Sequence, residues 1–232
     1  MPAPRAFDLV LFDLDGTLVD TAAEITDAVN AALREVGLAA VDAGFVTRRI
    51  GHGGAALLRG ALAARGGAPA GTPEHTRQLA ALLTTFEQVS AARCGVRSRP
   101  YPEAARTLDA LRAAGVSLAL VTNKEQRATH CLLRAHALSE RFDRVVCGDT
   151  FVTRKPDPAG VLDCLRQFGV EPARALFIGD SAIDAETARA AGIAVWLLPH
   201  GYNGGRPVEQ AAPDRVLPDL AAVRAALLPL AA

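Results

Sequence analysis

The chain has 232 residues, half of them hydrophobic, so it can bury a substantial core as one domain or as one domain with an insertion. Lys+Arg and Asp+Glu are balanced at 25 each and only 5% of residues are aromatic, which argues against partners such as nucleic acid or a membrane surface. No apolar run is long enough to span a bilayer, and no signal-peptide core is expected. The four cysteines are scattered, which indicates reduced thiols in a cytoplasmic protein rather than metal ligands.

In the stretch from Leu9 to Leu18, an apolar run ends at two closely spaced acids. The run lacks polar alternation, which predicts a strand buried on both faces of a parallel sheet. Asp15 and Gly16 then favour a turn. Asp13 and Asp15 are therefore expected at the carboxyl end of a buried strand, where open α/β sheets bind ligands and where a cation would offset the cost of desolvation. The alternative is a strand end whose acids face water.

Residues 20–99 are expected to be helical throughout. Thr21 and Glu24 form a capping-box pattern at the start of a helix that ends at Gly37. Helical spacing of apolar residues predicts three more helices, at 42–50, 55–65 and 73–92. Helices inserted directly after the first strand predict a separate small bundle, with hinges near Asp20 and Arg99.

From Pro102 onward, helices and strands alternate, as in a parallel sheet with crossover helices. Pro102 is expected in the first turn of its helix. Strands are expected at 116–121, 144–147, 175–178, 193–198 and 215–217, and helices at 102–114, up to about 136, 157–168, 182–191 and 220–228. The fold class predicted is α/β, a Rossmann-like three-layer parallel-sheet core with an inserted α-helical cap domain. Residues 1–19 and 100–232 would form the core and residues 20–99 the cap.

Two further groups suit phosphate chemistry. Thr122 follows a strand and precedes a helix, so its hydroxyl can donate to a phosphate oxygen, although Thr122-Asn123 is also an ordinary helix-capping pair. Lys155 precedes Pro156 and a helix, and its ammonium could screen the repulsion between a carboxylate and an anionic ester. The alternative for Lys155 is a solvated loop lysine.

A second acidic pair follows the strand expected at 175–178. Asp180 lies at that strand's carboxyl end and can complete an oxygen-rich site with Asp13 and a backbone carbonyl at Asp15. Hard oxygen ligands of this kind indicate Mg²⁺. Asp184 lies on the first turn of the next helix, where it could bind a metal-bound water or simply favour the positive end of the helix dipole.

Together these stretches resemble the four motifs of the haloacid dehalogenase-like hydrolases, in order and each at the end of an expected strand. The resemblance implies a phosphatase in which Asp13 attacks phosphorus and Asp15 shuttles the leaving-group proton. It implies catalytic roles for Thr122 and Lys155, a metal site drawn from Asp13, Asp15, Asp180 and Asp184, and Mg²⁺ as cofactor. It also implies substrate contacts by Thr17, Asn123 and Lys124.

Within that family the chain is most similar to the bacterial phosphoglycolate phosphatases, through residues 50–54, 99–102, 121–124 and 198–204. This implies a small phosphate ester as substrate, with 2-phosphoglycolate favoured. Its carboxylate would need donors on the cap, for which Arg48, Arg49, His52 or Gly53 are candidates. His52 and the two arginines depart from the residues common in relatives, and the arginines could equally lie on the solvated face of the cap.

Four other functions are weighed against the sequence. Another small phosphate such as a sugar phosphate could be the substrate, or the protein could be a phosphosugar mutase that protects an aspartyl-phosphate from water. A non-catalytic binding protein on the same fold is disfavoured because both Asp13 and Asp15 are present. A dinucleotide-binding enzyme is disfavoured because no Gly-x-Gly-x-x-Gly follows the first strand. A monomer or a homodimer is expected.

Overall fold

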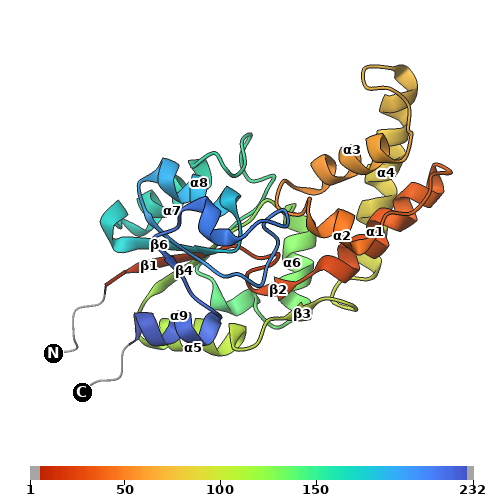
Figure 1. The fold of residues 1–232 in the computed structure, drawn as a ribbon. Coiled ribbons are helices and arrows are strands. Elements are labelled where there is room, and N and C mark those ends of the chain that lie inside the picture. Colours follow the sequence, from red (N-terminus) through yellow and green to blue (C-terminus); the bar gives the residue numbers. More distant parts are fainter. Residues whose placement is uncertain (1–5, 229–232) are drawn as a thin grey trace.

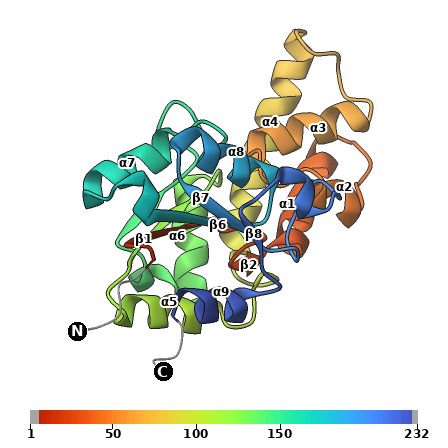
Figure 2. The same ribbon diagram turned by 60° about the vertical axis from the view of Figure 1, so that its left-hand side comes forward.

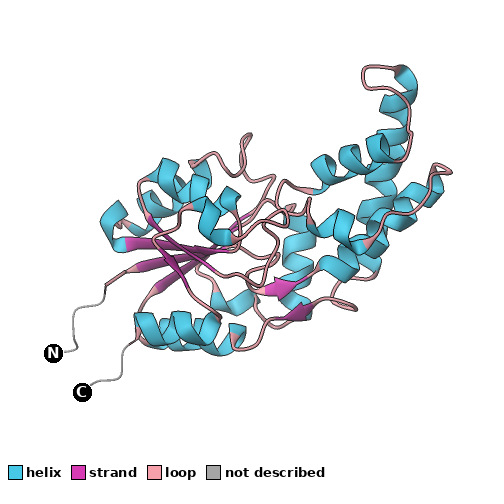
Figure 3. Ribbon diagram, viewed as in Figure 1, coloured by secondary structure: helices cyan, strands magenta, loops and turns pink. Residues whose placement is uncertain are grey.

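The computed structural model describes residues 6–228 of the chain. Its helices and the strands of its main sheet follow the predicted order, with shifts of one to a few residues at their ends (Figure 3). The short strands Val19–Asp20 and Arg99–Pro100 were not predicted, since residues 20–99 were expected to be helical throughout. The strands are β1 (Leu9–Phe12), β2 (Val19–Asp20), β3 (Arg99–Pro100), β4 (Ser117–Val121), β5 (Arg144–Val146), β6 (Ala175–Gly179), β7 (Ala194–Leu197) and β8 (Arg215–Val216).

Nine α-helices lie within the described residues. They are α1 (Ala22–Glu35), α2 (Ala43–Thr47), α3 (Gly54–Ala64), α4 (Pro73–Ala92), α5 (Ala104–Ala113), α6 (Gln126–Ala135), α7 (Ala159–Phe168), α8 (Ala182–Ala191) and α9 (Leu220–Leu227). Short 3₁₀ helices lie at Ser139–Arg141, Pro172–Arg174 and Val208–Ala211. Residues 6–228 contain no helix that combines the length and the apolar character needed to cross a membrane.

Six parallel strands form the main sheet, in the order β5-β4-β1-β6-β7-β8. Strand β1 lies between β4 and β6, and Phe12 pairs in register with Leu120 and Ile178. The carboxyl ends of β1, β4 and β6 therefore meet at one edge of the sheet. The predicted α/β fold is confirmed.

Helices cover both faces of this sheet (Figure 1). On one face, Val10 and Phe12 of β1 pack with apolar residues of α5, α6 and α9. On the other face, Leu9 and Leu11 pack with apolar residues of α7 and α8. All four residues of β1 are fully buried, as the apolar run predicts. Burial on both faces fixes where β1 ends, and with it the position of Asp13.

Helices α1–α4 form a lobe beside the sheet in both ribbon views (Figures 1 and 2). The lobe has a hydrophobic core of its own, centred on Val29, Leu33, Leu58 and Leu82, to which Tyr202 is added from beyond β7. The chain enters and leaves the lobe through β2 and β3, which pair antiparallel. Two strands that are 80 residues apart in sequence thus lie side by side at the junction.

Two local predictions are wrong. The capping box at α1 is absent, because the Thr21 hydroxyl donates to Asp15 (2.7 Å) and Glu24 accepts from the backbone and hydroxyl of Ser98 (3.1 and 3.0 Å). Pro102 also lies outside its helix, since α5 begins only at Ala104 after Glu103 adopts a left-handed conformation with φ of 66°. In both cases contacts or turns outside the helix determine how it begins.

Candidate active site

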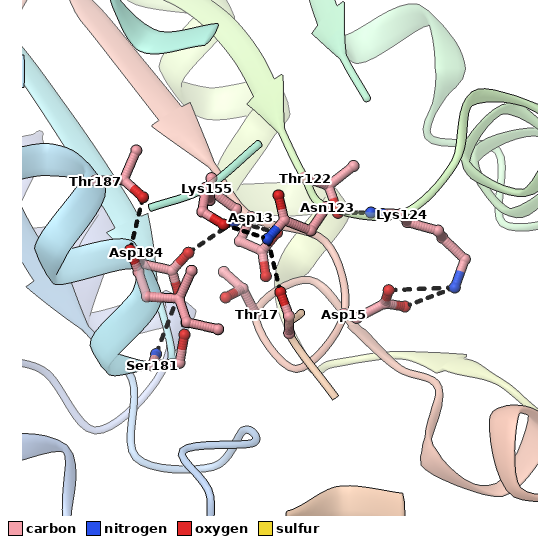
Figure 4. A network of polar contacts seen from close by, with 12 residues as sticks. Asp13, Asp15, Thr17, Thr122, Asn123, Lys124, Lys155, Ser181, Asp184 and Thr187 are labelled. Carbon is pink, nitrogen blue, oxygen red and sulfur yellow. Dashed lines mark hydrogen bonds and ion pairs between the residues drawn. The ribbon is translucent and has the colours of Figure 1, made fainter. Parts of the chain in front are cut away.

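The carboxyl edge of the sheet gathers side chains from β1, β4 and β6 and from the loop before α7 (Figure 4). Asp13 follows β1, Thr122 and Asn123 follow β4, and Asp180 follows β6. All four side chains belong to buried residues. The register of the parallel strands therefore brings Asp13 together with residues that lie 109 to 167 positions further along the chain.

Lys155 lies at the centre of this group. Its ammonium donates to Oδ1 of Asp13 (2.8 Å) and to Oδ1 of Asp184 (2.7 Å), and its side chain is only 4% exposed. Burial lowers the pKa of Lys155, but attraction to the two carboxylates outweighs burial and holds the pKa above its ordinary value. Lys155 is thus a permanent cation that fixes the Asp13 carboxylate, and a solvated loop position for it is excluded.

Asp184 is held on all sides by donors. Its Oδ2 accepts from the backbone N–H groups of Asp180 and Ser181 (both 3.1 Å) and from the Ser181 hydroxyl (2.8 Å), while its Oδ1 binds Lys155. The first turn of α8 thereby becomes a rigid support for the lysine. A C-terminal strand end followed by Asp-Ser-x-x-Asp is the sequence signal that could have pointed to Ser181, which the sequence analysis missed.

Asp180 lies in a close-fitting socket. Its Oδ1 accepts from the Thr17 hydroxyl (2.9 Å) and its Oδ2 from the backbone N–H of Tyr202. A Cβ at Gly201 would lie 2.2 Å from Oδ2 of Asp180, and a Cβ at Gly16, whose φ is +91°, would lie 2.4 Å from the same oxygen. Both positions therefore require glycine. Thr17 is thus engaged with Asp180, and its predicted contact with substrate stays a prediction.

The acids at this edge fit a divalent cation. One carboxylate oxygen from each of Asp13, Asp180 and Asp184 lies within 4.8 Å of the others. Burial raises the pKa of Asp13 to about 6, with Lys155 opposing the rise and Asp184 adding to it. Burial, with Asp184 and Asp13 next in effect, also raises the pKa of Asp180 well above its ordinary value. Three buried acids against one lysine leave excess negative charge, and an oxygen-rich set of this kind suits a hard divalent ion.

Asp15 lies apart from those three acids. Its two carboxylate oxygens accept from the Lys124 ammonium at 3.1 and 3.2 Å, and Oδ1 also accepts from the Thr21 hydroxyl. Burial lowers the pKa of Lys124, but Asp15, Glu125 and Glu24 together outweigh it and hold the pKa above its ordinary value. The Asp15 side chain is thus oriented by one residue of the core and one residue at the start of α1.

Asn123 links the sheet edge to the helical lobe. Its Nδ2 donates to the backbone oxygen of Lys155 and to that of Gly51, both at 2.8 Å, while its Oδ1 is buried and has no hydrogen-bond partner among the described residues. The Thr122 hydroxyl accepts from the backbone N–H of Lys124 (3.2 Å). Asn123 therefore contacts the lobe directly, and the predicted substrate contact of its side chain stays a prediction.

A cavity opens between the sheet edge and the lobe. Asp13, Asp15, Thr122, Asn123 and Lys124 line it from the sheet side. Arg49, the segment of Gly51, Gly53 and Gly54, Leu57 and Phe86 line it from the lobe. A ligand in this cavity would contact the nucleophile candidate Asp13 and the lobe at once.

The remaining predicted lobe residues differ in position. Gly53 lines the cavity, and a Cβ there would lie 2.5 Å from the Arg154 guanidinium, a residue that the sequence analysis did not single out. Arg48 and His52 are exposed. The structure thus brings Gly53 to the cavity and leaves Arg48 and His52 at the surface, so the substrate contacts predicted for all three stay predictions.

Tyr202 was also missed as a site residue. Its hydroxyl accepts from the backbone N–H groups of Thr21 (2.9 Å) and Ala22 (3.0 Å) and donates to Asp20, while its own N–H binds Asp180. One residue thus connects the acidic cluster to the start of the lobe. The Gly-Tyr pair after the fifth strand of the sheet was visible in the sequence, but the partners of the Tyr202 hydroxyl lie about 180 residues away.

Comparisons with known proteins find matches over most of the chain. The family described as haloacid dehalogenase-like hydrolase matches residues 10–198. The chain is 39% identical over 220 residues to a phosphoglycolate phosphatase of Nitrosospira multiformis, covering 95% of both proteins. It is 38% identical to phosphoglycolate phosphatase 1 of Pseudomonas aeruginosa, covering 94% of this chain and 79% of that protein.

Solved structures show the same fold. A crystal structure from Haemophilus somnus, described as a predicted phosphoglycolate phosphatase, superposes with a TM-score of 0.89 and 32% identity over 94% of this chain and 96% of that one. A Rhodobacter sphaeroides protein called CbbY, crystallised with phosphate, gives a TM-score of 0.76 and 26% identity over 93% and 95% of the two chains. The family match spans most of the chain and includes both acidic motifs, so this protein belongs to the haloacid dehalogenase-like hydrolase family.

Proposed function

We propose that the protein is a cytoplasmic, Mg²⁺-dependent phosphatase that hydrolyses 2-phosphoglycolate to glycolate and phosphate. One observation carries the proposal: the buried Asp13 carboxylate, held by Lys155 at 2.8 Å, faces a cavity shared with the helical lobe. The names of the relatives that cover most of the chain favour 2-phosphoglycolate among small esters. Four unpaired cysteines suit a reducing compartment.

In this proposal Asp13 is the nucleophile. One of its carboxylate oxygens forms a bond to phosphorus while the bond from phosphorus to the leaving alkoxide oxygen breaks, which yields an aspartyl-phosphate. The Lys155 ammonium holds the Asp13 carboxylate in position for attack on phosphorus. Together with the Thr122 hydroxyl and Asn123, it offsets the negative charge on the phosphoryl oxygens. The carboxylate is positioned before the substrate arrives, because Asp184 fixes the lysine in turn.

Asp15 would move the protons. It gives a proton to the leaving alkoxide and later takes one from the water that hydrolyses the aspartyl-phosphate. Asp13 and Asp180, with Asp15 through its backbone carbonyl and with Asp184, would hold Mg²⁺, which supplies positive charge to the phosphoryl oxygens when bound. Nucleophilic attack and proton transfer would be carried out by the side chains of Asp13 and Asp15.

The chain would divide into a catalytic core of residues 1–19 and 100–232 and a cap of residues 20–99. Two observations support this division: α1–α4 have a separate hydrophobic core, and the chain crosses between the parts at the paired strands β2 and β3. The cap would exclude bulk water from the cavity and contact the leaving group of the ester. The hydrogen bond from the Asn123 side chain to the Gly51 backbone oxygen joins the core to the cap.

The test is phosphate release from 2-phosphoglycolate beside sugar and nucleotide phosphates, with Mg²⁺ or with EDTA. We expect preference for 2-phosphoglycolate, loss of activity in EDTA, and a drop of about 10³-fold or more in Asp13→Asn. Glu186→Gln removes an exposed carboxylate from α8 and serves as the matched control. Preference for another ester would discard the substrate, a phosphoenzyme that persists for minutes would indicate a mutase, and an active Asp13→Asn would refute the nucleophile.

A further inference from the structure

The Lys124 ammonium is a cation inside the cavity that Asp13 faces. It binds both carboxylate oxygens of Asp15 (3.1 and 3.2 Å), and the Lys124 and Asp15 side chains are 15% and 12% exposed (Figure 4). Asp15 is also held by the Thr21 hydroxyl, so it keeps one donor if the lysine leaves. In this arrangement each oxygen of Asp15 accepts from the Lys124 ammonium, which ties the carboxylate to that lysine when no substrate is bound.

The other cations near the cavity are held by other groups or face solvent: the Arg154 guanidinium lies beside Gly53, but Arg154 is exposed. Among the described residues that line it, the cations are Lys124 and Arg49. The Arg49 guanidinium lies 3.8 Å from the centre of the Phe45 ring and donates to the Phe45 backbone oxygen (3.2 Å), both on its own side of the cavity. Lys155, from the loop before α7, is held by Asp13 and Asp184. Lys124 is therefore the cation best placed for a second anionic group on the substrate.

The surroundings of Lys124 make a cation necessary for such a substrate. Glu24 and Glu125 line the same cavity as Asp13 and Asp15, so an anion entering beside the phosphate meets negative charge. The backbone N–H of Lys124 donates to the Thr122 hydroxyl, which places the lysine two residues from a group proposed to bind phosphate. A substrate whose phosphate binds Thr122 can therefore bring a carboxylate to Lys124 only if few atoms separate the two anionic groups.

We propose that Lys124 selects the substrate by exchanging carboxylates: its ammonium passes from Asp15 to the carboxylate of the ester, which frees Asp15 for the leaving oxygen. This inference rests on the proposed function and gives a structural reason for its substrate class, phosphate esters of small 2-hydroxy acids. In such esters one carbon separates the carboxylate from the ester oxygen, so both anionic groups fit beside Thr122 and Lys124. The exchange breaks no covalent bond.

The experiment compares two esters of equal length, 2-phosphoglycolate and 2-hydroxyethyl phosphate, which carries a neutral hydroxymethyl group in place of the carboxylate. The kcat/KM ratio of the two esters is measured for wild type, Lys124→Met, Lys124→Gln and Arg49→Met in saturating Mg²⁺. Because both esters are assayed with the same preparation, the ratio does not depend on how much of a variant is folded. We expect both Lys124 variants to lower the preference for 2-phosphoglycolate by about 30-fold or more, mainly through KM.

The outcomes separate this inference from the proposed function. Equal losses on both esters in the Lys124 variants would mean that Lys124 only positions Asp15, and would overturn the exchange. Loss of the preference in Arg49→Met, with Lys124→Met unchanged, would assign the carboxylate to Arg49 and overturn it as well. A wild type without preference for 2-phosphoglycolate would refute the proposed function itself, whatever the variants do.

Discussion

Asp13→Asn should stabilise the metal-free protein while it abolishes activity. The carboxylate is buried, and its pKa rises from 3.8 to about 6 on folding, which corresponds to about 3 kcal/mol of unfolding free energy lost at neutral pH. Asparagine has nearly the same shape and no charge to desolvate. We therefore expect Asp13→Asn to be more stable than wild type by about 3 kcal/mol at pH 7.5 in EDTA, or by about 6–12 °C in Tm.

The stability difference between wild type and Asp13→Asn should depend on pH, in a direction that follows from the raised pKa of Asp13. Since the pKa of Asp13 is higher in the folded chain, the folded state binds more protons between pH 3.8 and about 6, and wild-type stability falls as pH rises through that window. The asparagine does not titrate. The difference between the two proteins should be near zero below pH 3.8, grow through the window and level off above pH 6.

Urea unfolding followed by circular dichroism, at a series of pH values in EDTA, measures this difference. Mg²⁺ should then stabilise wild type more than the variant, because the variant loses a ligand. Glu186→Gln changes an exposed acid on α8 and should leave stability within about 0.5 kcal/mol at every pH. The reasoning is refuted if Asp13→Asn is less stable than wild type at pH 7.5, or if the difference does not vary with pH.

Two further substitutions test the socket around Asp180 and the junction with the lobe. Gly201→Ala places a Cβ against the Asp180 carboxylate and should cost about 1–3 kcal/mol and most of the activity, whereas Gly60→Ala on α3 should be neutral or stabilising by up to about 1 kcal/mol. Tyr202→Phe leaves two N–H groups at the start of α1 without their acceptor. It should lower the free energy of unfolding, measured in urea, by about 1–3 kcal/mol. An unchanged urea midpoint would mean that water replaces the hydroxyl.

Much of the fold could be predicted from the sequence because the core strands are continuous apolar runs. Burial on both faces leaves β1 without polar positions, so its end at Asp13 is visible in the residues themselves. In the same way α4 and α8 have the predicted bounds, since clear start signals such as Pro73 and Ser181 coincide with helical spacing. The structure gathers the acids Asp13, Asp180 and Asp184 because parallel strands bring their carboxyl ends to one edge.

Contacts that depend on pairs of distant residues could not be predicted. Nothing near Lys124 in the sequence indicates Asp15 as its partner, and nothing near Asn123 indicates Gly51. The substrate-facing residues of the lobe were hard to predict for a further reason. Whether a helix residue lines a cavity or faces water depends on how the lobe meets the sheet, and periodicity within one helix does not contain that information.

The missing capping box shows how the site overrides a local rule. Thr21 and Glu24 have the right spacing to cap α1, yet Thr21 binds Asp15 and Glu24 binds Ser98 next to β3. The N–H groups of α1 are accepted instead by Tyr202, whose backbone also holds Asp180. The start of the lobe is thus hydrogen-bonded to Asp15, the candidate for proton transfer, and, through Tyr202, to Asp180, a candidate metal ligand. These shared hydrogen bonds therefore tie the start of α1 to both acids at the sheet edge.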